Sequence, residues 1–224
     1  MDVRDAVATR YSCRAFLSAP IDVAIVRDIL ERAARAPSGG NVQPWLVHAI
    51  AGARIEELKN LLRPRFANEL PRGEGPEYEV FPRELKQPYH GRRVRVGAQL
   101  YQAIGIPRED RPARYRQFSR NYLFFDAPVG IFVSLDRSLG PPQWSDVGGF
   151  IQNIMLLARA HGLHSCPQEA WTNWHKTLQP FLNLPPEYIL FCGVALGFAD
   201  ETAPINRWRS EREPLDAFAR FEGF

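Results

Sequence analysis

Cysteine is scarce in this chain of 224 residues, and the cysteines that occur show no paired spacing. There are three, Cys13, Cys166 and Cys192, an odd number that is not typical of a disulfide framework. Reduced thiols are typical of a reducing compartment, so we predict a cytoplasmic protein. His161 and His164 lie close together in the sequence but have no third candidate ligand, so no metal site is predicted.

Long apolar runs are also missing. The longest covers residues 188–199 and is interrupted by Gly193 and Gly197, well short of the ~20 residues that cross a bilayer as a helix. The first five residues are charged and lack the apolar core of a secretory signal. The net charge is only +3, and the basic residues are scattered along the chain. We therefore expect neither a membrane nor a nucleic acid as a partner.

Several common catalytic and nucleotide-binding motifs are absent. No Gly-x-Gly-x-x-Gly follows a strand pattern, which argues against a dinucleotide-binding half. No phosphate-binding loop ends in Gly-Lys-Ser/Thr, and no Gly-x-Ser-x-Gly nucleophile elbow is present. A nucleotide cofactor, if one binds, must therefore be held in another way.

The elements that are present alternate between helix and strand. The apolar fraction of 45% and the charged fraction of 24% are those of a globular domain. Periodicity and caps predict helices over 22–36, 53–62, 91–104, 110–120 and 144–161, and strands over 45–50, 127–135, 163–166 and 188–196. This alternation predicts a single α+β or α/β domain over residues 1–224.

Two segments lack a clear period. Residues 63–90 are rich in Pro, Gly and Glu and are predicted to form an irregular excursion or lid, or an ordinary surface loop. Residues 199–224 are predicted to form an extended C-terminal arm.

Two arginine segments at opposite ends of the chain are the most informative feature. In an extended segment the side chains at i and i+2 project from one face, which would align Arg10, Ser12 and Arg14, and likewise Arg207 and Arg209. Planar guanidinium groups and a hydroxyl match a phosphate dianion. The alternative is two solvated basic stretches on the surface.

Two loops have the composition of ligand-binding segments. Residues 36–45 read Ala-Pro-Ser-Gly-Gly-Asn-Val-Gln-Pro-Trp, in which paired glycines allow close backbone approach to a flat ligand and the amides offer donors and acceptors. Residues 167–170, Pro-Gln-Glu-Ala, follow a strand end. Their simpler interpretations are a helix stop and a connecting loop.

Taken together, these segments resemble the flavin-dependent nitroreductases. Arg10-Tyr11-Ser12-Cys13-Arg14 resembles the N-terminal Arg-x-Ser-x-Arg of that family, the 36–45 segment resembles its most recognisable motif, and residues 203–209, preceded by Gly197, resemble its closing phosphate segment. The motifs occur in the family's order, and the resemblance spans residues 4–218. Gln143-Trp144-x-Asp146-x-Gly148 with Gln152-Asn153 suggests the branch that contains nitrobenzoate-type reductases.

The resemblance implies an α+β three-layer sandwich, in which helices flank a central mixed, mainly antiparallel sheet, and a homodimer with an FMN site at each end of the subunit interface. The implied FMN-binding residues of one subunit are Arg10, Tyr11, Ser12, Arg14, Pro167, Gln168, Glu169, Arg207 and Arg209. The other subunit would contribute Pro37, Ser38, Gly39 and Asn41. The backbone of Glu169 and Ala170 would face the flavin N5 and O4, although many relatives have glycine where this chain has Ala170.

The implied activity is FMN-mediated oxidation of NADH or NADPH with reduction of a nitroaromatic compound, such as nitrobenzoate, or a quinone. A shared open flavin face implies ping-pong kinetics without a catalytic acid–base side chain. Other flavin reactions (reductive dehalogenation or flavin cleavage) and a non-catalytic flavin sensor or store remain alternatives. Arg120, Asn121 and Phe124 are candidate contacts for the aromatic acceptor, or else form a helix end packed on the next strand.

Overall fold

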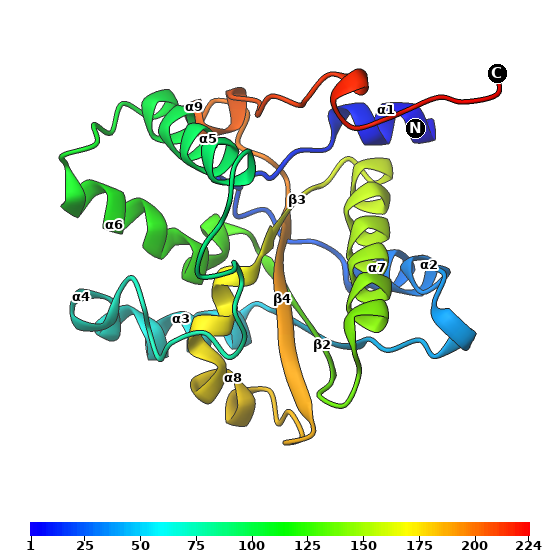
Figure 1. Ribbon diagram of the computed structural model, residues 1–224. Coiled ribbons are helices and arrows are strands. Elements are labelled where there is room, and N and C mark those ends of the chain that lie inside the picture. Colours follow the sequence, from blue (N-terminus) through cyan, green and yellow to red (C-terminus); the bar gives the residue numbers. More distant parts are fainter.

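The computed structural model describes residues 1–224 and is built on one four-stranded sheet (Figure 1). Its strands are β1 (Leu46–Ala51), β2 (Val129–Asp136), β3 (His164–Gln168) and β4 (Tyr188–Gly197), in the order β1-β2-β4-β3. Every neighbouring pair is antiparallel. Val133 pairs with Cys192 and Ser134 with Leu190, so Phe191 is an extra residue that forms a bulge in β4.

Helices cover both faces of this sheet. They are α1 (Val3–Thr9), α2 (Val23–Ala33), α3 (Ala53–Leu62), α4 (Phe66–Glu69), α5 (Tyr89–Ala103), α6 (Arg111–Ser119), α7 (Pro141–Ala160), α8 (His175–Phe181) and α9 (Pro204–Arg207). Side chains of Asp2, Asp22 and Asp110 accept hydrogen bonds from first-turn N–H groups and so fix the starts of α1, α2 and α6. No helix is both long and apolar enough to cross a membrane.

The core consists of two apolar clusters separated by the sheet. On one face α2 and α7 pack against residues of β2 such as Ile131 and Val133. On the other, Phe132 of β2 packs against Trp171 of the 3-10 helix η4 (Glu169–Trp174). Fully burying one such aliphatic or aromatic side chain contributes roughly 1.5–3 kcal/mol. Because both faces are covered, β2 and β4 are apolar almost throughout.

The predicted α+β sandwich is confirmed by this arrangement. Its one parallel contact is the isolated bridge between Ser12 and Ser165 at the β3 edge. Among the boundaries that differ from prediction, those of β3 and α7 have a clear physical reason. Strand β3 continues through Pro167, which is tolerated because β3 is an edge strand. Helix α7 begins at Pro141, because proline needs no N–H partner in the first turn.

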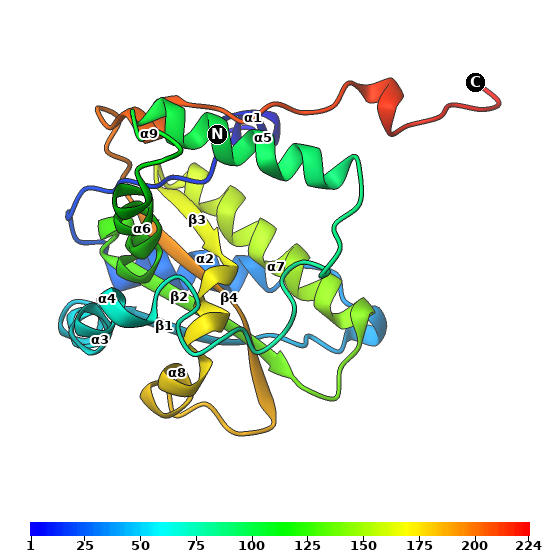
Figure 2. The ribbon, with the colours of Figure 1, turned by 60° about the vertical axis from the view of Figure 1, so that its left-hand side comes forward.

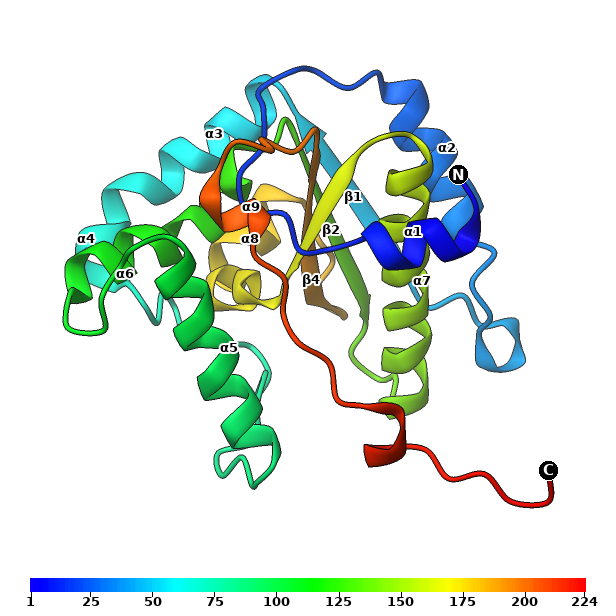
Figure 3. The same cartoon turned by 90° about the horizontal axis from the view of Figure 1, so that it is seen from above.

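The two ends of the chain run side by side. Leu17 N–H donates to Phe198 O over 2.9 Å, and Asp200 N–H donates to Ala15 O over 3.0 Å. Figure 3 shows the N-terminal segment passing beside α9 on the upper side of the sheet. Beyond α9 the chain has little regular structure apart from the 3-10 turn Leu215–Ala217, and its last residues project from the body (Figure 2).

The excursion over residues 63–90 is attached to the body in its first half. After η2 (Arg63–Arg65) and α4 it has no regular helix until α5. Arg65 forms ion pairs with Glu69 and Glu74, and Glu74 also accepts a hydrogen bond from Thr177 N–H. Further along, the Tyr78 hydroxyl donates to Phe191 O. These contacts hold residues 65–78 against η4, α8 and β4.

Candidate active site

Arginine side chains from both chain ends line one cavity of about 590 Å³. Arg10, Ser12 and Arg14 come from the segment after α1, and Arg209 comes from the segment after α9. Helix α5 closes another side of the cavity, and Gln152 of α7 reaches its wall. The structure therefore brings together the two arginine segments that the sequence analysis singled out.

Asn206 joins these two segments. It is 3% exposed, and its amide oxygen accepts a hydrogen bond from Arg14 N–H at 2.9 Å. Its amide nitrogen donates to Ala15 O at 2.7 Å and to Asp200 O at 2.8 Å. No role was predicted for Asn206, because two of its partners, Arg14 and Ala15, lie almost the whole chain length away and no periodic pattern indicates such contacts.

The guanidinium groups of this cavity have no acidic partner. None of Arg10, Arg14 and Arg209 forms a salt bridge. Arg209 lies over the Tyr11 ring at 3.6 Å and donates to Trp208 O at 2.9 Å, so its position is fixed. Burial lowers the pKa of Arg10, and the charge of Arg212 lowers it further. Such uncompensated cations, of which Arg10 and Arg14 are half-buried, fit a phosphate group together with the Ser12 hydroxyl.

Arg207 lies apart from this group. The extended segment predicted through Arg207 is wrong, because Pro204 begins the short helix α9 and Arg207 ends it. Its side chain is exposed, donates to Glu201 O, and lines a second cavity of about 560 Å³. Arg209 lines both cavities and so connects the two.

His164 lies in the wall of that second cavity. It is 8% exposed, and Nη1 of Arg159 is 2.9 Å from its Nε2. Burial, together with the charges of Arg159 and Arg209, lowers the pKa of His164 to about 4. The imidazole is therefore neutral near pH 7, and the charged residues that line this cavity are Arg159, Arg207, Arg209 and Glu201.

The loop after α2 is not in contact with the arginine cavity of the same chain. It includes the 3-10 turn η1 (Gly39–Asn41), and Gly39 N–H donates to Asp146 Oδ2 of α7 at 3.1 Å. Ser38 Oγ accepts from Gln43 N–H at 3.0 Å. Pro37, Gly39 and Asn41 are exposed, and none of them lines the cavity. This placement is what a contribution from another subunit requires.

Residues 167–170 cover the end of β3 and the start of η4. Pro167 is half-buried, and Glu169 is on the surface. The Gln168 side chain is buried and donates to Asn121 O at 2.7 Å, so it points into the protein. The N–H groups of Glu169 and Ala170 stand at the N-terminal end of η4, where helical N–H groups have no partner within the helix.

Of the three candidate acceptor contacts, Phe124 does not fit that role. It is fully buried, and its ring lies 4.6 Å from Trp171 and fills the space above Gly130. Arg120 forms an ion pair with Asp126 at 2.9 Å, and the Asn121 side chain donates to Phe118 O at 2.9 Å. All three belong to η3 (Arg120–Asp126), which packs against α6, η4, α3 and β4. The alternative of a packed helix end describes them better.

Comparison with known proteins gives a consistent answer. The model of the "Nitroreductase family" matches residues 7–198. The chain is 37% identical over 219 residues to a nitrobenzene nitroreductase of Ectopseudomonas oleovorans, which covers 98% of this chain and 96% of the relative. It is 35% identical to a 4-nitrobenzoate reductase of Pseudomonas putida, over 97% of this chain and 94% of that one.

Solved structures agree with these sequence matches. The crystal structure of the FMN and NADPH-dependent nitroreductase NfnB from Sphigopyxis sp. strain HMH superposes with a TM-score of 0.95 at 43% identity and covers 100% of both chains. The FMN-dependent nitroreductase NfnB from Mycobacterium smegmatis, solved in complex with NADPH, gives a TM-score of 0.92 at 27% identity and covers 98% of this chain and 97% of its own. The resemblance seen in the three sequence motifs is thereby confirmed: this chain belongs to the nitroreductase family.

Proposed function

We propose that this protein is an FMN-containing NAD(P)H oxidoreductase that reduces nitroaromatic compounds, with nitrobenzenes and nitrobenzoates as the favoured acceptor class. The observation that carries the proposal is the convergence of Arg10, Arg14 and Arg209 around one cavity without any carboxylate partner. Full-length relatives with nitroarene-reducing names support the acceptor class.

The residues of the cavity suit the phosphate tail of FMN. Arg10, Ser12, Arg14 and Arg209 would hold the phosphate, with each charge-assisted hydrogen bond contributing roughly 1.5–3 kcal/mol. Tyr11 supports Arg209 by stacking, and Asn206 fixes the backbone that carries Arg14. Arg207 would add positive charge from the second cavity, but it would not contact the phosphate directly.

The other site residues would serve the flavin ring. When bound, FMN accepts a hydride equivalent from the nicotinamide donor and delivers electrons to the second substrate. The ring would lie between the β3–η4 junction of one subunit and the loop 37–41 of the other. There the N–H groups of Glu169 and Ala170 are donors for a carbonyl or ring nitrogen that gains negative charge. No side chain need transfer a proton, and donor and acceptor would use one open face in turn.

We infer a homodimer, because Pro37, Gly39 and Asn41 are exposed and none of them lines the arginine cavity of its own chain. A second copy would bring its loop to the first copy's cavity, so that each site contains residues of both protomers. The three cysteines are free and buried, which suits the cytoplasmic location that we propose.

Purification and a turnover assay test the function directly. We expect a yellow protein with a flavin absorption spectrum that, without oxygen, oxidises NADPH or NADH in repeated turnovers only when nitrobenzene or nitrobenzoate is supplied. Replacing either Arg10 or Arg209 with Ala should weaken flavin binding, whereas Arg220→Ala, an equal charge change on the exposed arm, should not. A protein that neither binds added FMN nor consumes NAD(P)H with these acceptors would contradict the proposal.

A further inference from the structure

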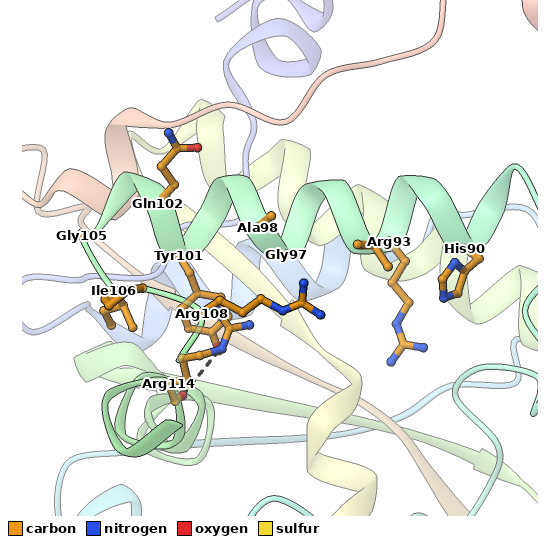
Figure 4. A pocket seen from close by; sticks show the side chains of 12 residues that line it. His90, Arg93, Gly97, Ala98, Tyr101, Gln102, Gly105, Ile106, Arg108 and Arg114 are labelled. Carbon is orange, nitrogen blue, oxygen red and sulfur yellow. Dashed lines mark hydrogen bonds between the residues drawn. The ribbon is translucent and has the colours of Figure 1, made fainter. Parts of the chain in front are cut away.

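A third cavity, of about 760 Å³, lies between α5 and α6, beside the arginine cavity. Arg93 reaches it from α5, Arg108 from the connecting turn and Arg114 from α6 (Figure 4). Gly97 lines both this cavity and the arginine cavity. A Cβ at Gly97 would meet no atom within 4 Å, so the space beside this residue is open.

This cavity concentrates positive charge without neutralising it. Helices α5 and α6 contain arginines but no Asp or Glu. Neither Arg93 nor Arg114 is ion-paired; they stack on Phe81 at 4.0 Å and on Tyr101 at 3.7 Å, respectively. Arg108 forms no hydrogen bond or ion pair with the protein at all. Of the two carboxylates that follow Arg108 in the sequence, Glu109 is exposed and does not line the cavity, and Asp110 caps α6.

The lining suits a sugar phosphate better than an aromatic acceptor. Only four of its twelve residues are hydrophobic. One face of Tyr101, the aromatic ring of this cavity, is already covered by Arg114. A nitroarene would therefore find little free aromatic surface to stack on, whereas a phosphate monoester dianion could bind two or three guanidinium groups together.

We propose that this cavity binds the 2′-phosphate of NADPH and thereby makes the protein prefer NADPH to NADH. The inference rests on the proposed function in one respect: the nicotinamide of the same donor must reach the flavin that is bound next to this cavity. Gly97 lines both cavities, so the proposed 2′-phosphate site adjoins the proposed FMN site. Arg108 is the principal phosphate ligand, because its guanidinium has no hydrogen bond or ion pair with the protein to break before it binds the phosphate.

Arg108→Ala is the decisive variant, and Arg116→Ala is its control. Arg108 forms no hydrogen bond or ion pair that the substitution would break, and Arg116 is an exposed arginine of α6 that lies outside the cavity. In Arg108→Ala we expect the KM for NADPH to rise about tenfold, which corresponds to one charge-assisted hydrogen bond. The KM for NADH and kcat should stay unchanged, and Arg116→Ala should resemble the wild type.

Calorimetric measurement of 2′-AMP binding to the purified protein tests the phosphate site independently of the reductase activity. The wild type and Arg116→Ala should bind 2′-AMP more tightly than 5′-AMP, and Arg108→Ala should lose that difference. This result in a protein without reductase activity would support the phosphate site and contradict the proposed function.

Other results would overturn the phosphate site and leave the reductase function standing. One such result is an active enzyme in which Arg108→Ala raises the KM for NADH and the KM for NADPH by the same factor, or changes neither. Another is that Arg108→Ala raises the KM for 4-nitrobenzoate but not the KM for nitrobenzene or NADPH. The guanidinium groups would then bind the carboxylate of the acceptor.

Discussion

Asn206 shows how one buried amide can set the geometry of a site that it does not line. Three hydrogen bonds connect it to Arg14 N–H, Ala15 O and Asp200 O. Leaving such buried partners unsatisfied costs on the order of 1–3 kcal/mol for each group. The arginine side chains therefore converge because the backbones beneath them are joined at this residue.

His164 makes the stability of the molecule depend on pH. Its pKa is lowered to about 4 by burial and by Arg159 and Arg209. The pKa of an unfolded histidine is about 6.5, so the unfolded state binds more protons between these two values. Stability is therefore complete above the unfolded pKa and is lost as the pH falls through this window, by up to about 1.4 kcal/mol per pH unit. The titratable side chains of Tyr11, Arg207 and Glu201 also line the cavity that contains His164.

We expect the contribution of His164 to appear as a difference between the wild type and His164→Asn. Urea unfolding at several pH values between 7 and 4.5 should show that the wild type loses more stability than the variant over this range. Carboxylate titrations are common to both proteins and cancel in the difference. Parallel curves for the two proteins would mean that His164 titrates normally.

At the scale of elements, the apolar pattern was enough for a helix that buries one regular face and for a strand that is buried on both faces. The patterns over 53–62 and 127–135 correspond closely to α3 and β2. Helix α9 could not be predicted in this way, because it is a single turn fixed by the burial of Ile205 and by the long-range hydrogen bonds of Asn206. The arginine motif was likewise readable from the sequence, whereas its connection through Asn206 depends on contacts between the chain ends.

The element η3 illustrates a second limit of sequence reasoning. Phe124 and Phe125 have φ values of 52° and 53°, a conformation that is unfavourable for bulky residues and is held here by packing. This turn directs Phe124 into the core over Gly130, whereas the sequence alone was also compatible with Phe124 contacting the aromatic acceptor. Gly130 is required at this point, because a Cβ there would lie 2.4 Å from the Phe124 ring.

Gly130→Ala should therefore destabilise the protein by roughly 1–3 kcal/mol, the usual range for overpacking a core. Phe124→Leu should also destabilise it, through a lost aromatic contact. The two effects should not add, because the smaller side chain at 124 makes room for the new methyl group. Chemical unfolding of both single variants and the double variant measures this coupling. Strict additivity would show that Phe124 does not restrict position 130.

At the scale of the whole molecule, the loop 37–41 and the arginine cavity belong to one proposed site but do not meet within one chain. If the site combines two protomers, its two halves can be inactivated separately. Arg10→Ala with Arg209→Ala removes the phosphate contacts. Gly39→Glu leaves the protomer fold intact, because a Cβ at this residue meets no atom within 4 Å, but it places a charged side chain on the face offered to a partner.

Each variant alone should be inactive as a homodimer, and co-expression should restore activity. Every mixed dimer has one site built from the intact cavity of one chain and the intact loop of the other, while its second site carries both defects. With random pairing, half of the dimers are mixed, so about a quarter of wild-type activity and flavin content should return. Flavin absorbance and NADPH oxidation of the co-purified protein measure this. If loop and cavity of the same chain formed the site, each chain in the mixture would keep its own defect and no activity would return.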